Sequence, residues 1–218
     1  MPFQNVALAK KAAMIMRITS KKHTHFNWGQ PMKRTFLLSA TLIALSSAPA
    51  LAHTGHTATD GLTSGLAHPF LGADHLLAMV AVGLFAVQSG GVNRFLLPLL
   101  FVGTMIVGGA LGLSGVAVPF VEAGIVGSVI LLGAAIAYGR HIPAPAAAVM
   151  VAAFALFHGV AHGTEMPADA SALAYGAGMA IATAILHVMG MGVATVVPSV
   201  LRFAGGAIAL SGIALAAM

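Results

Sequence analysis

The sequence predicts an all-α, polytopic membrane protein: a bundle of six transmembrane helices that follows a cleavable signal peptide. Apolar residues make up 59% of the 218 residues and charged residues only 7%, and the mean hydropathy is +0.96. This composition is typical of a polytopic membrane protein and unlike that of a soluble domain. The apolar stretches are continuous and do not alternate with polar residues, so helices are favoured over the strands of a membrane β-barrel.

The N-terminal part of the chain has the pattern of a signal peptide. Residues 1–31 are basic, polar and without a regular period, and we interpret them as an upstream extension before a biological start at Met32. Two basic residues and a short apolar run follow, and then a small-x-small triplet at residues 50–52, as at a signal-peptidase site. We therefore expect residues 32–52 to be a cleaved signal peptide. The alternative is that residues 35–52 are retained as a first helix, although their apolar core is short for a membrane span.

Cleavage would leave residues 53–65 as an extracytoplasmic N-terminal arm. This arm holds His53, beside the new α-amine, and His56. Amine and imidazole nitrogens both suit divalent transition metals. Two histidines in a short polar arm are equally well explained as a solvated tail, so both interpretations stay open for His53 and His56.

Residues 66–218 are predicted to form one six-helix transmembrane domain, because the apolar stretches have the length of bilayer-spanning helices and the connections are short. The six expected spans are Leu66–Val87, Phe95–Leu113, Phe120–Tyr138, Ala144–Gly163, Ala170–Val193 and Val197–Ala217. Several of them contain glycines at helical spacing, which we expect to allow close packing of helix backbones.

Arginine positions predict the orientation of this domain. A cleaved signal peptide places the mature N-terminus outside the cytoplasm, so the connections after the first, third and fifth spans would face the cytoplasm. Every arginine after residue 53 lies at one of these connections: Arg94, Arg140 and Arg202. This distribution follows the positive-inside rule. We expect both termini of the mature chain on the periplasmic side of a bacterial inner membrane.

Composition also excludes several functions. Seven of the ten Lys and Arg residues precede residue 35, and from His53 onward three Arg and five Asp or Glu give a net charge of −2. The body of the protein therefore has no basic surface for nucleic acid. The sequence has no cysteine, which excludes disulfides, thiolate metal sites and cysteine nucleophiles. It also has no Gly-x-x-x-x-Gly-Lys-Ser/Thr element for binding ATP.

The first polar cluster lies in the first span and contains His68, Asp74 and His75. Ionisable side chains inside a membrane-spanning segment indicate a functional site. If the span is one straight helix, His68 and His75 share a face but lie about 10 Å apart along the axis, and Asp74 points about 100° away from His75. Such a helix would offer successive metal ligands along a path and not a complete chelating site.

The second polar cluster, at the end of the fourth span, contains His158, His162 and Glu165. The two histidines are four residues apart, so they are neighbours on one helical face and can chelate one cation. Glu165 falls on the same side if the helix continues. The expected topology places both clusters at the outer end of the bundle, where their side chains would face one another around a cavity. Nitrogen and carboxylate ligands without sulfur suit divalent nickel, cobalt or zinc better than copper(I).

Three further residues are secondary candidates for metal ligands. His187, near the cytoplasmic end of the fifth span, is an exit ligand, a proton acceptor or a histidine hydrogen-bonded between helices. Glu122 is either a ligand or an interfacial residue. Met79 is either a soft ligand one turn past His75 or, as is usual for methionine in such helices, a packing residue.

At these residues the chain resembles the HupE/UreJ family of nickel permeases and nickel-enzyme accessory proteins. The first family motif, His-Pro-x-x-Gly-x-Asp-His with Met and Gly at four-residue steps, matches His68, Pro69, Gly72, Asp74, His75, Met79 and Gly83. The second, Phe-His-Gly-x-Ala-His-Gly-x-Glu, matches Phe157, His158, Gly159, Ala161, His162, Gly163 and Glu165. The resemblance covers residues 53–218, and the segment before Met32 departs from the family pattern. It implies uptake of nickel or cobalt for hydrogenase or urease, with the matched His, Asp and Glu residues binding the metal.

These features favour a secondary transporter or facilitator that passes Ni(II) or Co(II) from periplasm to cytoplasm, with the metal as cargo and no permanently bound cofactor. We expect no enzymatic activity. The implied partners are the divalent ion, the lipid bilayer and maturation proteins of hydrogenase or urease. Two alternatives stay open: an intramembrane metalloenzyme whose cation activates water, and a non-transporting accessory or metal-sensing protein. The choice of metal, the driving force and the oligomeric state are also open.

Overall fold

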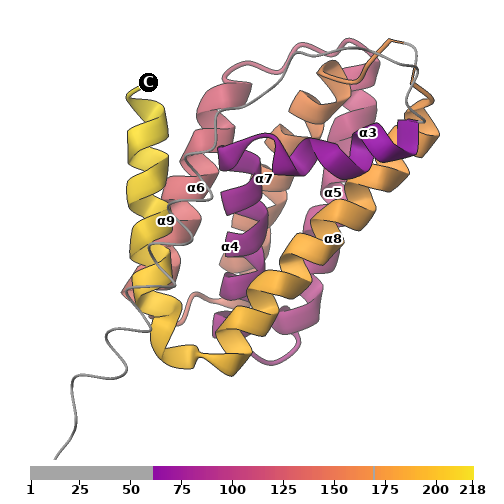
Figure 1. The fold of residues 1–218 in the computed structure, drawn as a ribbon. Helices are drawn as coiled ribbons and strands as arrows, with labels where there is room; N and C mark the ends of the chain where they lie inside the picture. The colour runs from indigo at the N-terminus through magenta and orange to yellow at the C-terminus, as the bar shows by residue number, and fades with distance from the viewer. Residues whose placement is uncertain (1–60, 169) are drawn as a thin grey trace, which may run out of the picture. The chain divides into compact units, whose positions relative to one another are not determined.

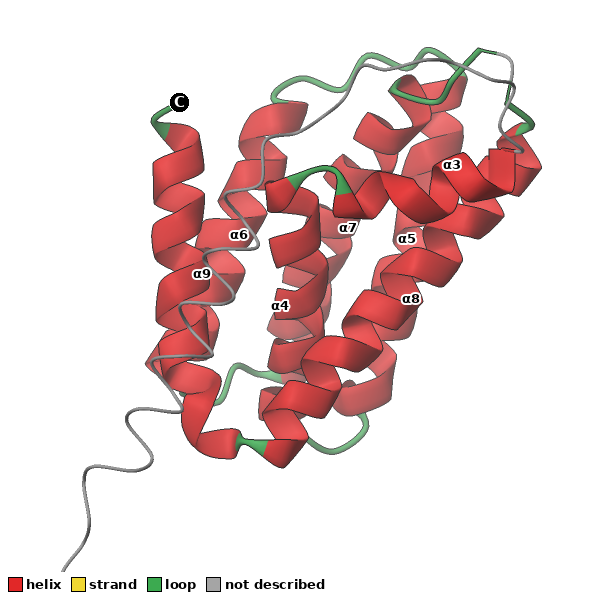
Figure 2. Ribbon diagram, viewed as in Figure 1, coloured by secondary structure: helices red, strands yellow, loops and turns green. Residues whose placement is uncertain are grey.

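The computed structural model describes residues 61–168 and 170–218, which form helices and loops and contain no strand (Figure 2). Its elements are α3 (Gly61–Ala67), the 3-10 turn η1 (His68–Phe70), α4 (Ala73–Ser89), α5 (Asn93–Leu113), α6 (Val121–Tyr138), α7 (Ala144–Thr164), α8 (Ala172–Val196), the 3-10 turn η2 (Pro198–Val200) and α9 (Leu201–Ala216) (Figure 1). The all-helical prediction is confirmed for these residues. The expected upstream extension, the signal peptide, His53 and His56 lie outside the described residues and stay predictions.

The helices have the length and composition of membrane spans. Four of them, α5 to α8, are long and apolar enough to cross a bilayer, and so is the segment Pro198–Ala216, which joins η2 and α9. The remaining expected span is a bent pair, in which residues 61–70 and α4 meet at 81°. The described residues therefore provide five membrane-spanning helices, or six if the bent pair is one span.

The expectation of one straight helix over Leu66–Val87 is wrong. The chain leaves α3, turns through η1 and begins α4 only after an extended Gly72. Pro69 explains the break, because proline lacks a backbone N–H and its ring clashes with the preceding turn of a helix. It sits at the start of η1, where no donor is required. Residues 61–65, expected as the end of the polar arm, instead form most of α3.

Helix α4 lies at the centre of the bundle, with contacts to α5, α6, α8 and α9, and α3 packs across α8 (Figure 1). Helices α5 and α7 form one extensive interface, and α6 and α9 form another. Glycines permit the approach of α5 to α7, as expected from their spacing. A Cβ atom added at Gly159 would meet the Met105 backbone oxygen and the Gly108 Cα. This contact holds the histidine-bearing end of α7 firmly against its neighbour.

The two ends of the bundle differ in chemistry. The α4–α5, α6–α7 and α8–α9 connections lie together at one end (Figure 1). Arg94 donates a hydrogen bond to Thr195 Oγ1 at this end, and Arg202 lies against Gly139, the neighbour of Arg140. The three arginines of the described residues therefore gather at one end, and the η1 turn and the C-terminal end of α7 lie at the other.

Candidate metal site

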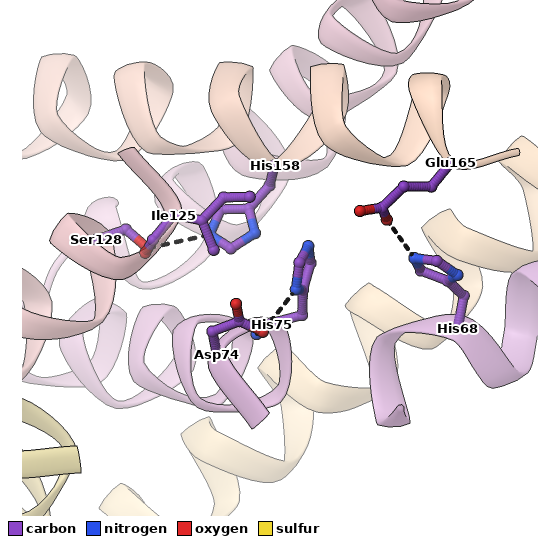
Figure 3. Close-up of polar contacts among 7 residues, drawn as sticks. All are labelled: His68, Asp74, His75, Ile125, Ser128, His158 and Glu165. Atoms are coloured by element: carbon purple, nitrogen blue, oxygen red, sulfur yellow. Dashed lines mark hydrogen bonds and ion pairs between the residues drawn. The ribbon is translucent and has the colours of Figure 1, made fainter. Parts of the chain in front are cut away.

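The structure brings the six primary candidate side chains into one region at the end opposite the arginines, and Figure 3 shows all of them except His162. Two overlapping sets of ligand atoms can be defined. The buried group consists of His75, His158 and His162, and the rim group consists of His68, His162 and Glu165. Within each group the ligand atoms all lie within 4.8 Å of one another. His162 belongs to both groups.

The bend between η1 and α4 makes this convergence possible. On a straight helix His68 and His75 would be about 10 Å apart along the axis, but their ring centroids are 6.3 Å apart. The turn directs His68 towards α7, where its ring centroid lies 5.0 Å from that of His162. The expectation that these residues offer only successive ligands on one helix face is therefore corrected: His68 and His75 belong to two groups linked through His162.

His75 is held by its neighbour Asp74. The Asp74 Oδ1 atom accepts hydrogen bonds from the backbone N–H of His75 at 2.8 Å and from its Nδ1 at 2.8 Å. An ionised carboxylate only accepts, so the proton resides on Nδ1 and the lone pair on Nε2 is free. Carboxylates orient metal-binding histidines in this way. The expectation that Asp74 points away from His75 is wrong, and Asp74 falls in neither ligand group.

Gly72 leaves room for this carboxylate–imidazole pair. A Cβ atom added at Gly72 would lie 2.8 Å from Asp74 Oδ1 and 3.0 Å from His75 Nδ1. Both distances are shorter than ordinary van der Waals contact. The lack of a side chain at Gly72 therefore allows Asp74 and His75 to pair, in addition to the role of Gly72 in the break between the helices.

His158, on α7, is fully buried and contacts a residue from another helix. Its Nε2 lies 3.0 Å from the Oγ atom of Ser128 on α6. The ring centroid of His158 is 5.0 Å from that of His75. Ser128 belongs to neither polar cluster, and sequence analysis missed it, because one serine in an apolar helix carries no spacing signal.

His162 lies between the two groups, one turn beyond His158. Its ring centroid is 4.5 Å from that of His75 and 5.0 Å from that of His68. The residue is 3% exposed, and neither ring nitrogen has a hydrogen-bond partner among the described residues. His162 can therefore direct a nitrogen to either group.

Glu165 forms the solvent-accessible edge of the site, as the C-cap of α7. Its Oε2 atom lies 3.0 Å from Nε2 of His68, and the Glu165 side chain is 45% exposed. The hydrogen bond from His68 lowers the pKa of the Glu165 carboxyl group from its ordinary value. The carboxylate is therefore charged at neutral pH, where it favours the approach of a cation.

The secondary candidates lie outside both groups. His187 on α8 is 1% exposed, neither of its ring nitrogens has a hydrogen-bond partner within the described part of the chain, and its ring contacts Phe101 at 5.1 Å between centroids. Phe101 also contacts His158, at 5.7 Å. The sulfur of Met79 accepts a hydrogen bond from Thr183 in the core, which agrees with the packing interpretation. Glu122 is exposed in the first turn of α6.

The groups have the chemistry of a cation site. His75 Nε2, His158 Nδ1 and both nitrogens of His162 are buried without a partner among the described residues. Unpaired buried polar atoms are costly, so such atoms call for a ligand, an ion or water. Three imidazole nitrogens suit divalent nickel, cobalt or zinc, whereas magnesium and calcium prefer oxygen.

A separate hollow in the bundle has different chemistry. A pocket of about 470 Å³ lies between α5, α7 and α8, with an almost entirely apolar lining that includes His162. Such a lining does not stabilise a hydrated cation. We therefore locate the candidate ion site in the histidine groups and not in this pocket.

Comparison with known proteins gives one family. The family described as HupE / UreJ protein matches residues 41–215. Protein HupE of Rhizobium leguminosarum bv. viciae is 46% identical over 185 residues, which cover 82% of this chain and 96% of that protein. No solved structure matches the chain.

Proposed function

Because this chain belongs to the HupE/UreJ family, we propose that it is a secondary transporter or facilitator that carries Ni(II), or Co(II), across the bacterial inner membrane for supply to hydrogenase or urease. The observation that carries the proposal is that the rim group and the buried group share His162. Two adjoining sites with a common ligand suit an ion that moves. In this proposal the metal is the cargo, and the protein is not an enzyme and holds no permanent cofactor.

Capture begins at the rim group. Glu165 is charged and 45% exposed, and His68 beside it is 25% exposed, so a hydrated cation can reach both side chains. The carboxylate supplies the charge that attracts the ion, and the imidazoles replace part of its water shell. His162 then holds the ion at the border of the bundle.

Transfer to the buried group proceeds by exchange of ligands around His162. As His68 and Glu165 release the ion, His75 and His158 replace them, and His162 stays bound or turns with the ion. The ion therefore never loses all of its protein ligands inside a low-dielectric bundle, where a bare charge would be very unfavourable.

The path beyond the buried group leads towards the arginine end. The Phe101 ring contacts both His158 and His187, so we propose that the ion passes this ring and reaches the buried imidazole of His187. The arginine end is assigned to the cytoplasm by the positive-inside rule. Import from periplasm to cytoplasm follows from that assignment.

Reconstituted protein tests the proposal. Purified protein in liposomes that enclose a nickel-sensitive dye should admit externally added Ni(II), and His162→Ala should abolish this flux. His141→Ala is the matched control, because His141 is an exposed histidine at the arginine end, outside both groups. Flux in His162→Ala equal to that of the unmodified protein would overturn the proposal.

The same purified protein also separates the alternatives. A protein that binds Ni(II) tightly but admits none into liposomes would be an accessory or metal-sensing protein. A purified protein that retains a stoichiometric metal through extensive chelator washing would favour an intramembrane metalloenzyme, since a transporter must release its cargo.

A further inference from the structure

Ser128 is a buried polar residue on α6, a helix that contributes no histidine to the site. It is fully buried, and its Oγ atom has two neighbours within hydrogen-bond distance. One is the backbone oxygen of Ile125, at 2.6 Å, and the other is Nε2 of His158, at 3.0 Å (Figure 3). The directions of these two hydrogen bonds can be worked out from the donors and acceptors available.

A serine hydroxyl carries one hydrogen. The Ile125 carbonyl oxygen can only accept, so the short contact of 2.6 Å requires the hydroxyl to donate to it. Ser128 Oγ has then no hydrogen left for His158 and can only accept. Nε2 of His158 must therefore carry the proton and donate it to Ser128. In a neutral imidazole this leaves a lone pair on Nδ1.

The unprotonated nitrogen faces the site. Nδ1 of His158 is buried without a partner among the described residues, as is Nε2 of His75. Figure 3 shows the nitrogen of His158 that is not bonded to Ser128 on the side of the ring that faces His75. With the opposite tautomer, an N–H group would point into the buried group, and His158 could not bind a metal through that nitrogen.

We propose that Ser128 is a positioning residue that fixes the Nε2–H tautomer of His158, so that His158 binds the metal through Nδ1. The buried site then combines Nε2 of His75, oriented by Asp74 on α4, with Nδ1 of His158, oriented by Ser128 on α6. This inference deepens the proposed function and rests on it for the identity of the cargo, but not for the geometry of the donors.

The first measurement reads the tautomer directly. Full-length protein with ¹⁵N-labelled histidine, in lipid nanodiscs and without metal, is examined by NMR, which distinguishes protonated from unprotonated ring nitrogens. The spectrum of His158→Gln assigns the His158 signals. We expect a single Nε2–H tautomer in the unmodified protein and a mixture in Ser128→Ala. An Nδ1–H tautomer in the unmodified protein would overturn the inference, whatever the variants do.

The second measurement reads metal affinity, with Co(II) as the probe because its visible absorption reports ligand geometry. Loss of a residue that orients a metal ligand costs roughly 10–100-fold in affinity, and we expect that loss in Ser128→Ala. Ser128→Thr keeps a hydroxyl and should restore both the tautomer and the affinity. Co(II) affinity in Ser128→Ala equal to that of the unmodified protein would contradict the assignment.

Ser114→Ala is the matched control. Ser114 Oγ also donates to the carbonyl oxygen three residues earlier, at 2.8 Å, but it is exposed and makes no hydrogen bond to a histidine of the described segments. Its loss should leave the His158 tautomer and the Co(II) affinity unchanged. Both readouts are made without transport, so a protein that shows them but admits no Ni(II) would refute the transporter and not the role of Ser128.

Discussion

The imidazoles of the buried group differ in the partner that determines which ring nitrogen carries the proton. Asp74 accepts a hydrogen bond from Nδ1 of His75, and Ser128 accepts one from Nε2 of His158, but His162 has no such partner among the described residues. His75 and His158 are therefore oriented for one metal position, whereas His162 can bind a metal at either of two positions. This difference suits fixed ligands at the buried position and a mobile ligand at the border.

Substitution of the two rim histidines should separate these roles. His162→Ala removes a ligand from both groups, whereas His68→Ala removes one only from the rim group. We expect the Co(II) affinity of His162→Ala to fall by more than the roughly 10–100-fold that follows loss of an orienting residue, and that of His68→Ala to fall much less. Equal losses in a Co(II) absorption titration would contradict the shared role of His162.

The charge of Glu165 gives a prediction about pH. The hydrogen bond from His68 lowers the Glu165 pKa. The negative charge of this carboxylate is therefore fully present above its ordinary titration range, and it is lost only as the pH falls through the lowered pKa. Between pH 7 and pH 5 the Glu165 carboxylate therefore stays charged.

Glu165→Gln should accordingly weaken Co(II) binding at pH 5 as well as at pH 7, because the carboxylate is charged at both. Lys and Arg side chains do not disturb the comparison, because no described residue of either type lies at this end of the bundle. Equal Co(II) affinity of Glu165→Gln and the unmodified protein at pH 5 would show that Glu165 has lost its charge there, contrary to its lowered pKa.

At the scale of helices, hydropathy predicted most of the fold and missed the break that assembles the site. The expected spans Phe95–Leu113 and Ala144–Gly163 differ from α5 and α7 by at most two residues at either end. The prediction that the first span is one helix was wrong because a hydropathy window averages over Pro69 and Gly72. These residues change the backbone conformation and not the hydrophobicity. Ser128 could not be predicted at all, because its role depends on the pairing of α6 with α7.

The packing of α5 against α7 makes a prediction about Gly159. A methyl group there would meet the backbone of Met105, Gly108 and Gly109, which cannot move as a side chain can. Overpacking of this kind costs about 1–3 kcal/mol, so Gly159→Ala should lower the thermal stability of the purified protein and, because it separates α7 from α5, also its Co(II) affinity.

Gly127→Ala is the control for that experiment. A Cβ atom added at Gly127, also within a membrane-spanning helix, meets no atom of residues 61–168 or 170–218 within 4 Å. It should leave thermal stability unchanged or raise it slightly, since alanine favours helix more than glycine does. Equal thermal stability of Gly159→Ala and Gly127→Ala would show that the glycine contact does not hold α7 in place.

At the scale of the whole bundle, direction of transport depends on which end faces the cytoplasm. The rim group lies at the end opposite the three arginines, so import requires the rim on the periplasmic side. The sequence contains no cysteine, which allows single cysteines to report accessibility without background. Val116, between α5 and α6, is 44% exposed at the rim end, and His141 is exposed at the arginine end.

A membrane-impermeant maleimide applied to intact spheroplasts should label Val116→Cys, because the positive-inside rule places the α5–α6 connection outside the cytoplasm. His141→Cys should be labelled only after the membrane is permeabilised, and the unmodified protein should not be labelled in either condition. The reverse pattern would place His68, His162 and Glu165 on the cytoplasmic face. The same ligands would then capture metal from the cytoplasm, and the route through His162 to the buried group would describe export and not import.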